Sequence, residues 1–186
     1  MEISKEQIKE IEKFAKSKLH SVHLQHTLES RDVAKKLARL EKADWAIVEV
    51  AVLLHDIAKG KKLHAEVGAE MARKFLTTKQ YDQRFIEEVV YCILVHEDLD
   101  DDQKNLVRTK EAIVVYDSEK IQKISAFGII KYICGHNDNF KDNYEQTTLK
   151  MYQSLKRKYD RIISKQGKEM ASDGFKFIKE YFKELK

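Results

Sequence analysis

The strongest constraint on the fold is the absence of proline from all 186 residues, together with the presence of only six glycines. Proline and glycine are the residues that most often end helices and shape the turns between strands. The alternation of apolar and polar residues that marks strands is almost absent, whereas apolar residues recur at helical spacing along nearly the whole chain. The sequence therefore predicts an all-α fold.

Capping residues predict several helix boundaries. Ser4 followed by Gln7 resembles a capping box that opens a first helix, ending at about residue 19. Asp44 and Asp82 are predicted to cap helices that end near residues 58 and 97. Further helices are predicted over about 26–40, 64–76, 118–133, 143–164 and 167–185, with a short element over 111–116 in which 112–115 is the one candidate strand. The acidic residues Asp98, Asp100, Asp101 and Asp102 are predicted to form a solvated loop.

Length and composition favour a single soluble domain over residues 1–186, with its core at about 20–135 and a C-terminal helical extension at about 143–185. No apolar run approaches the roughly 20 residues that span a bilayer, so a membrane partner is not expected. The N-terminus has no apolar signal region, which predicts a cytoplasmic protein. Cys92 and Cys134 are predicted to be reduced core cysteines.

Positive charge is concentrated near the C-terminus, where residues 150–186 contain 11 Lys/Arg against five Asp/Glu. These charges alternate with apolar residues at helical spacing, which is typical of a solvated helix face. No nucleic-acid-binding motif accompanies them, so nucleic acid is not expected as a partner. The two long amphipathic helices at this end leave a homodimer open.

The polar pair His55–Asp56 interrupts the apolar stretch from Ala51 to Lys59. A buried, ionised aspartate is costly unless a cation, a charged side chain or several hydrogen bonds meet it. Imidazole nitrogen and carboxylate oxygen are both ligands of first-row divalent ions, so this pair is predicted to bind metal. His26 lies near the start of another predicted helix and can join the pair.

Two carboxylates, Asp117 and Glu119, lie near the start of a third predicted helix and can supply the remaining metal ligand. A site with no thiolate and with mixed nitrogen and oxygen ligands suits Mn²⁺, Co²⁺, Ni²⁺, Mg²⁺, Fe²⁺ or Zn²⁺. The predicted centre is mononuclear, with open positions for water and substrate.

The ordered set of His26, the His55–Asp56 doublet and a later acidic residue resembles the HD-domain metal-dependent phosphohydrolase superfamily, whose pattern is H…HD…D on an all-helical fold. The likeness to its small stand-alone members extends over residues 23–182. It includes His64 with Gly68-Ala69, His96, Glu111-Ala112-Ile113, Tyr116-Asp117, Gly167-Lys168-Glu169-Met170-Ala171 and Phe177-Ile178.

This chain departs from the family pattern at two places. A segment that usually reads Asp-Ala-Asp-Lys-Leu is here Asp117-Ser118-Glu119-Lys120-Ile121. This register puts Glu119 at the ligand position and leaves Asp117 as the alternative. Ala58 stands where glycine is common after the HD doublet, while Lys59 is retained.

The resemblance implies hydrolysis of a nucleotide, or of another small phosphate ester or anhydride, by a metal-activated water, with the protein acting as a nucleotidase or nucleotide pyrophosphatase. Asp56 and Lys59 are the implied catalytic residues. Lys59, His64 and His96 are implied to bind phosphate, or the two histidines hold a second metal with Asp56 bridging. The alternatives are a non-catalytic metal- or nucleotide-binding module and a di-iron oxygenase that uses the extra histidines.

Overall fold

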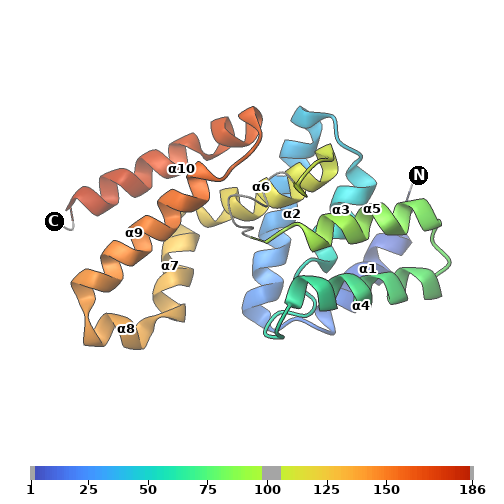
Figure 1. Cartoon of the computed structure of the whole chain (residues 1–186), viewed down its shortest axis with the longest axis horizontal. Helices are drawn as coiled ribbons and strands as arrows, with labels where there is room; N and C mark the ends of the chain where they lie inside the picture. The colour runs from blue at the N-terminus through green and yellow to red at the C-terminus, as the bar shows by residue number, and fades with distance from the viewer. Residues whose placement is uncertain (1–2, 98–105, 185–186) are drawn as a thin grey trace. The chain divides into compact units, whose positions relative to one another are not determined.

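The computed structural model describes residues 3–97 and 106–184, and the regular elements in these ranges are all α-helices, so the predicted fold class is confirmed. The helices are α1 (Lys5–Lys16), α2 (Ser21–Glu41), α3 (Trp45–Leu54), α4 (His64–Thr78), α5 (Gln83–Leu94), α6 (Lys110–Lys123), α7 (Ala126–Gly135), α8 (Asn137–Asp142), α9 (Tyr144–Asp160) and α10 (Lys165–Glu184) (Figure 1). The predicted loop at Asp98 and Asp100–Asp102 lies outside the described residues.

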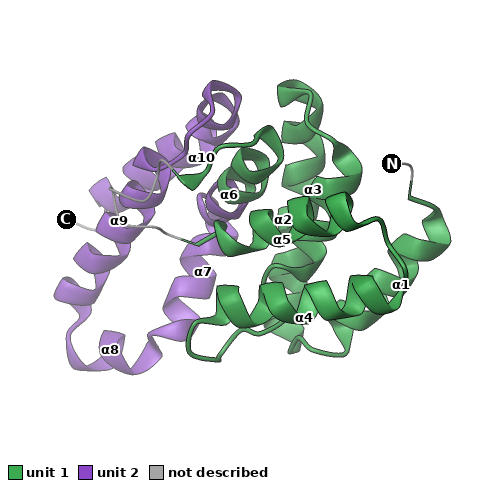
Figure 2. Cartoon of the chain, turned by 45° about the vertical axis from the view of Figure 1, so that its right-hand side comes forward, with its two compact units in different colours: residues 1–118 green, residues 119–186 purple. Residues whose placement is uncertain are grey.

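The chain divides into two compact units, Met1–Ser118 (unit 1) and Glu119–Lys186 (unit 2), which Figure 2 colours separately. Helix α6 runs unbroken through the boundary between Ser118 and Glu119. The assignment of residues 1–186 to a single domain, with a core at 20–135 and an extension at 143–185, stays a prediction.

Helix α3 is the centre of unit 1, where it packs against α1, α2, α4 and α5. Every residue from Ile47 to Leu54 is buried. Apart from Glu49, which pairs with Arg31 of α2, these residues are apolar. A helix that is apolar on nearly all sides has no solvent face and is covered by its neighbours. Asp44 caps α3 through the backbone N–H of Ala46, as predicted.

Two other helix starts were also predicted correctly. The Ser4–Gln7 capping box is present at α1, and Asp82 accepts a hydrogen bond from the Phe85 N–H at α5. These caps satisfy backbone donors that the first helical turn leaves without intrahelical partners.

Gly68 lies where α4 packs against the residues that follow α3. A Cβ atom at this position would lie 3.4 Å from the backbone oxygen of His55 and 3.7 Å from the Ala58 Cβ, which are ordinary contact distances. The start of α4 therefore lies next to the HD doublet.

Two predicted boundaries are wrong in ways that affect the site. Helix α2 begins at Ser21, so His26 lies in its second turn and not at its start. Helix α6 is continuous from Lys110, so 112–115 is helical and both Asp117 and Glu119 lie well inside a helix. Residues 114–122 are all buried, so they show no polar face from which helical periodicity could be recognised.

In unit 2, α8 packs against α7 and α9, and α10 packs against α9. Gly174 in α10 lies against the Ile124 carbonyl oxygen so closely that a Cβ atom would overlap it.

Cys92 is buried in unit 1 as predicted, but Cys134 is exposed at the end of the short helix α7, so its assignment to the core is wrong. Among the described residues, no helix is both long enough and apolar enough to cross a membrane.

Candidate metal centre

The HD doublet lies where α3 ends. Helix α3 stops at Leu54, and His55 and Asp56 follow with only 1% and 2% of their surfaces exposed. The Nδ1 atom of His55 is 2.7 Å from the Val52 carbonyl oxygen, which can only accept a hydrogen bond. The ring proton is therefore on Nδ1, and Nε2 carries the lone pair that a metal ligand needs.

His96 follows the end of α5, and a hydrogen bond from its ring to a backbone carbonyl orients it as it does His55. Its Nδ1 atom is 2.5 Å from the Ile93 carbonyl oxygen, three residues earlier, and its side chain is 3% exposed. A backbone acceptor at this position holds the ring and leaves Nε2 as the outward-facing nitrogen.

Four histidine rings from four helix segments form a connected group. The ring centroids of His26 and His55 are 5.7 Å apart, those of His55 and His96 are 5.0 Å apart, and those of His64 and His96 are 5.6 Å apart. The three interplanar angles are 72°, 73° and 69°. In each of the three pairs, the edge of one ring meets the face of the other.

Asp56 is the centre of this group. Its Oδ2 is 3.6 Å from Nε2 of His55. Its Oδ1 is 3.2 Å from the Lys59 ammonium, 3.4 Å from Nε2 of His64 and 3.6 Å from Nε2 of His96. Each oxygen of the carboxylate thus faces a different set of nitrogen atoms.

These side chains form two groups in which all ligand atoms lie within 4.8 Å of one another. One group is His26, His55, Asp56 and Glu119, and the other is Asp56, His64 and His96. Asp56 belongs to both. Glu119 reaches the first group from the continuous helix α6, whereas the fully buried Asp117 is in neither.

The donor set fits a divalent cation. With the ring proton of His55 held at Nδ1, Nε2 of His55 and the carboxylate oxygens of Asp56 and Glu119 are all electron-pair donors. Lys59 contacts Asp56 and Lys123 contacts Glu119, so each carboxylate already has a positively charged neighbour. A divalent cation among the converging ligand atoms would neutralise the two carboxylates directly. Nitrogen and oxygen ligands without a thiolate suit Mn²⁺, Co²⁺, Ni²⁺, Fe²⁺, Mg²⁺ or Zn²⁺.

Lys59, His64 and Glu97 line the more open side of the centre. Nε2 of His64 is 3.0 Å from the Lys59 ammonium and 2.7 Å from the Glu97 carboxylate. Burial, reinforced by the charge of Lys59, lowers the pKa of His64 from its ordinary value of 6.5, so the ring is neutral at pH 7. Its Nε2 can then accept from Lys59 or donate to Glu97, according to the tautomer.

Sequence reasoning did not assign a role to Glu97. Its side chain is 40% exposed, and it contacts a histidine that lies far from it in the chain. The only available signal was its position next to His96. The contact with His64 depends on the packing of α4 against α5, which the sequence pattern does not specify.

An all-α fold with a buried centre of histidines and carboxylates defines a metal-binding helical protein. The chain belongs to the HD-domain family, because the model of the HD domain matches residues 24–124. Membership in this family supports metal-dependent hydrolysis as the general class of activity. The chain matches no curated protein sequence.

Several solved structures have the same fold. Bacillus subtilis YpgQ is 21% identical, with a TM-score of 0.80, over 97% of this chain and 94% of that chain. Its complex with ADP aligns at 20% identity and a TM-score of 0.79, over 96% of each chain. An HD-superfamily hydrolase from Bacillus thuringiensis is 19% identical, with a TM-score of 0.77, over 97% of this chain and 95% of that chain. At these identities the likeness shows the fold.

Proposed function

We propose that this protein is a metal-dependent phosphohydrolase that acts on a nucleotide. The observation that carries the proposal is the position of Asp56, whose two oxygens face two potential metal-binding groups while Lys59 contacts one of them from the more open side. Buried ligand atoms beside a partly exposed cation suit a substrate whose anionic group must reach the metal.

In this proposal, His26, His55, Asp56 and Glu119 would hold the ion. When bound, it would act as a Lewis acid toward a phosphoryl oxygen and would lower the pKa of a water molecule toward neutrality. The hydrogen bond from His55 to the Val52 carbonyl keeps the ring in the ligand orientation. Oδ1 of Asp56 faces Lys59 and His64, and in this position it can accept a proton or a hydrogen bond on the substrate side.

Lys59, His64 and His96 are proposed to bind the phosphate. The Lys59 side chain is 35% exposed and brings a positive charge to the side of the centre from which substrate would arrive. Neutral His64 can donate a hydrogen bond to a phosphate oxygen through its protonated ring nitrogen. Phosphoryl transfer needs mainly positioning and charge neutralisation, which such groups supply. With Asp56 bridging, His64 and His96 could instead hold a second ion.

The choice of a nucleotide as substrate rests on analogy of fold. A complex of Bacillus subtilis YpgQ with ADP exists, and that chain superimposes on 96% of this one. A nucleoside monophosphate cleaved to a nucleoside and a triphosphate cleaved to a monophosphate and pyrophosphate are both consistent with the proposed centre.

The test is a screen of nucleoside mono-, di- and triphosphates against chelator-treated protein reloaded separately with each of the six candidate metals. Release of phosphate indicates a nucleotidase, and release of pyrophosphate indicates a nucleotide pyrophosphatase. If no nucleotide releases phosphate or pyrophosphate with any of the metals, the proposal is contradicted and a non-catalytic module is favoured. Two irons per chain and a coloured sample would instead indicate a di-iron oxygenase.

The two candidate acids of α6 can be separated by metal titration. We expect Glu119→Gln to weaken metal affinity at least ~10-fold, because a direct ligand should matter no less than the outer partners that cost 10–100-fold. Asp117→Asn should leave the affinity within about twofold, since Asp117 is outside both groups. Calorimetric titration of the folded variants measures both, and the reverse result would assign the ligand to Asp117.

A further inference from the structure

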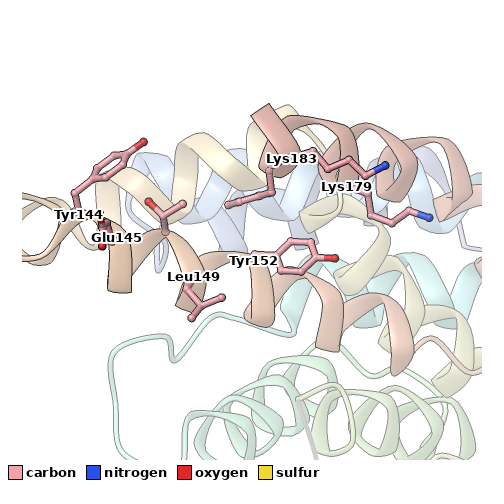
Figure 3. A pocket seen from close by; sticks show the side chains of 8 residues that line it. Tyr144, Glu145, Leu149, Tyr152, Lys179 and Lys183 are labelled. Carbon is pink, nitrogen blue, oxygen red and sulfur yellow. The ribbon is translucent and has the colours of Figure 1, made fainter. Parts of the chain in front are cut away.

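Unit 2 contains a pocket that the proposed hydrolysis does not use. Its volume is about 530 Å³, within the range of small-molecule sites, and it lies between α9 and α10. Helix α9 contributes Tyr144, Thr148, Leu149 and Tyr152 along one face. The α10 wall is made by Lys179, Phe182 and Lys183, as Figure 3 shows for the two lysines.

The apolar part of this pocket is aromatic. The rings of Tyr152 and Phe182 have their centroids 5.2 Å apart and are tilted by 48°. Tyr144 and Leu149 are more than half exposed, at 55% and 54%, although both carry large apolar surfaces. Aromatic walls of this kind favour a flat ring that can stack or meet them edge to face.

The charged part of the pocket is divided between its two ends. Figure 3 shows Lys179 and Lys183 extending on the side of Tyr152, while Glu145 lies near Tyr144 at the other end. The lysines are four residues apart, so like charges lie on one helix face and repel each other. Within residues 3–97 and 106–184, neither ammonium group forms an ion pair, although that of Lys179 lies 5.2 Å from the centroid of the Phe175 ring. A cation over a ring face keeps its charge, so both lysines can bind an anion.

A polar atom in the same wall also lacks a partner. Oγ1 of Thr148 is buried and makes no hydrogen bond to any described residue. Burial of a hydroxyl without a partner is unfavourable, and a helical threonine can turn its hydroxyl by changing between two rotamers. A ligand that occupies the pocket could therefore accept a hydrogen bond from Thr148.

We propose that the α9–α10 pocket binds a small aromatic molecule with one anionic group, a carboxylate or a phosphate. The ring lies against Tyr152, Leu149 and Phe182. The anionic group lies at the end lined by Lys179 and Lys183, where it relieves their mutual repulsion. The site is separate from the metal centre, so its occupancy does not depend on hydrolysis.

The test uses the full-length protein and three probes: 2-naphthoate, its neutral analogue 2-naphthol, and the non-hydrolysable 2-naphthylmethylphosphonate. Binding is followed by calorimetry and by the NMR signals of Thr148 and Leu149. We expect saturable binding of at least one anion that shifts these signals, with 2-naphthol about tenfold weaker. The tighter anion assigns the group as carboxylate or phosphate.

The double variant Lys179→Glu/Lys183→Glu should weaken binding of the anion at least ~10-fold, because two ion contacts are lost. Lys176→Glu is the matched control, since it reverses an exposed charge on the same helix outside the pocket, and it should change affinity less than about twofold. Leu149→Trp fills the pocket without changing charge and should abolish binding. Circular dichroism checks that each variant is folded.

Four outcomes would overturn the proposal. They are binding of neither anion more tightly than naphthol, equal weakening by Lys176→Glu, shifts confined to residues outside α9 and α10, and absence of saturable binding. Sedimentation that reveals a dimer whose interface covers Leu149 and Lys183 would also overturn it, because the face would then belong to a second copy of the chain.

Discussion

The two units differ in how far their functional polar side chains are exposed to solvent. In unit 1, His26, His55 and Asp56 are at most 2% exposed and converge on a common space. In unit 2, the lysines beside the α9–α10 pocket are exposed, and aromatic side chains supply most of the apolar wall. Burial of ionisable groups lowers stability unless a partner of opposite charge is present. Unit 1 should therefore depend on a bound ion far more than unit 2 does.

The largest expected effect comes from Asp56→Asn, which removes the carboxylate shared by both groups. We expect metal affinity and any phosphohydrolase activity to fall by at least ~100-fold, because outer partners of metal ligands already cost 10–100-fold. Calorimetric metal titration and the nucleotide assay measure the two quantities. His20→Ala alters an exposed histidine and is the control. Full activity in Asp56→Asn would remove the centre from the mechanism.

Metal removal tests whether the dependence is confined to the helices that carry the proposed ligands. At an ion concentration of 100 times Kd, a ligand that binds only the folded state stabilises it by about 2.7 kcal/mol. Hydrogen exchange should show this protection in α2 and α3 but not in α9 and α10. Equal protection of all four helices on metal addition would contradict the comparison between the units.

Two glycine substitutions test the packing of each unit. Gly174→Ala in unit 2 should destabilise the protein by about 1–3 kcal/mol, because the new methyl group overlaps the Ile124 carbonyl oxygen. Gly68→Ala in unit 1 should be neutral or should stabilise the protein by up to about 1 kcal/mol, because its methyl group would lie in ordinary contact with the His55 carbonyl oxygen at 3.4 Å and alanine favours a helix. Urea unfolding measures both, and a large loss of stability in Gly68→Ala would contradict this difference.

The smallest effect is expected at a surface pair within unit 1. A hydrogen bond from Arg73 lowers the pKa of Glu87 below its ordinary value of 4.5. The stabilisation is therefore present above pH 4.5 and is lost as the pH falls through the lowered value. Glu87→Gln should lower the urea midpoint slightly at pH 7, because exposed pairs contribute little, and this difference should diminish as the pH is lowered below 4.5. A large change at pH 7 would contradict the contrast between buried and exposed charges.

The fold class and the histidine–aspartate group could be predicted because each rests on local signals. The apolar run into His55 and Asp56 shows both the buried helix and the polar groups that need a partner. The boundaries of α2 and α6 could not be predicted in the same way. The mostly polar stretch 20–26 is typical of a loop, although the helix already begins at Ser21. Residues 114–122 are all buried, so their sequence shows no polar face from which the helical period could be recognised.

Long-range packing explains the other limits of sequence reasoning. The contact between Glu97 and His64 exists because α4 and α5 pack together. The lining of the α9–α10 pocket depends on which faces of those two helices meet. Composition and periodicity specify the apolar face of each helix, but they do not specify its neighbour.

The single carboxylate of Asp56 has a consequence for ion stoichiometry. Because its two oxygens serve different histidines, an ion drawn to one oxygen withdraws electron density from the other. Two ions that share one bridging anion also repel each other. Filling the two positions should therefore show negative cooperativity, with a tight first step, a weaker second step and a biphasic titration curve.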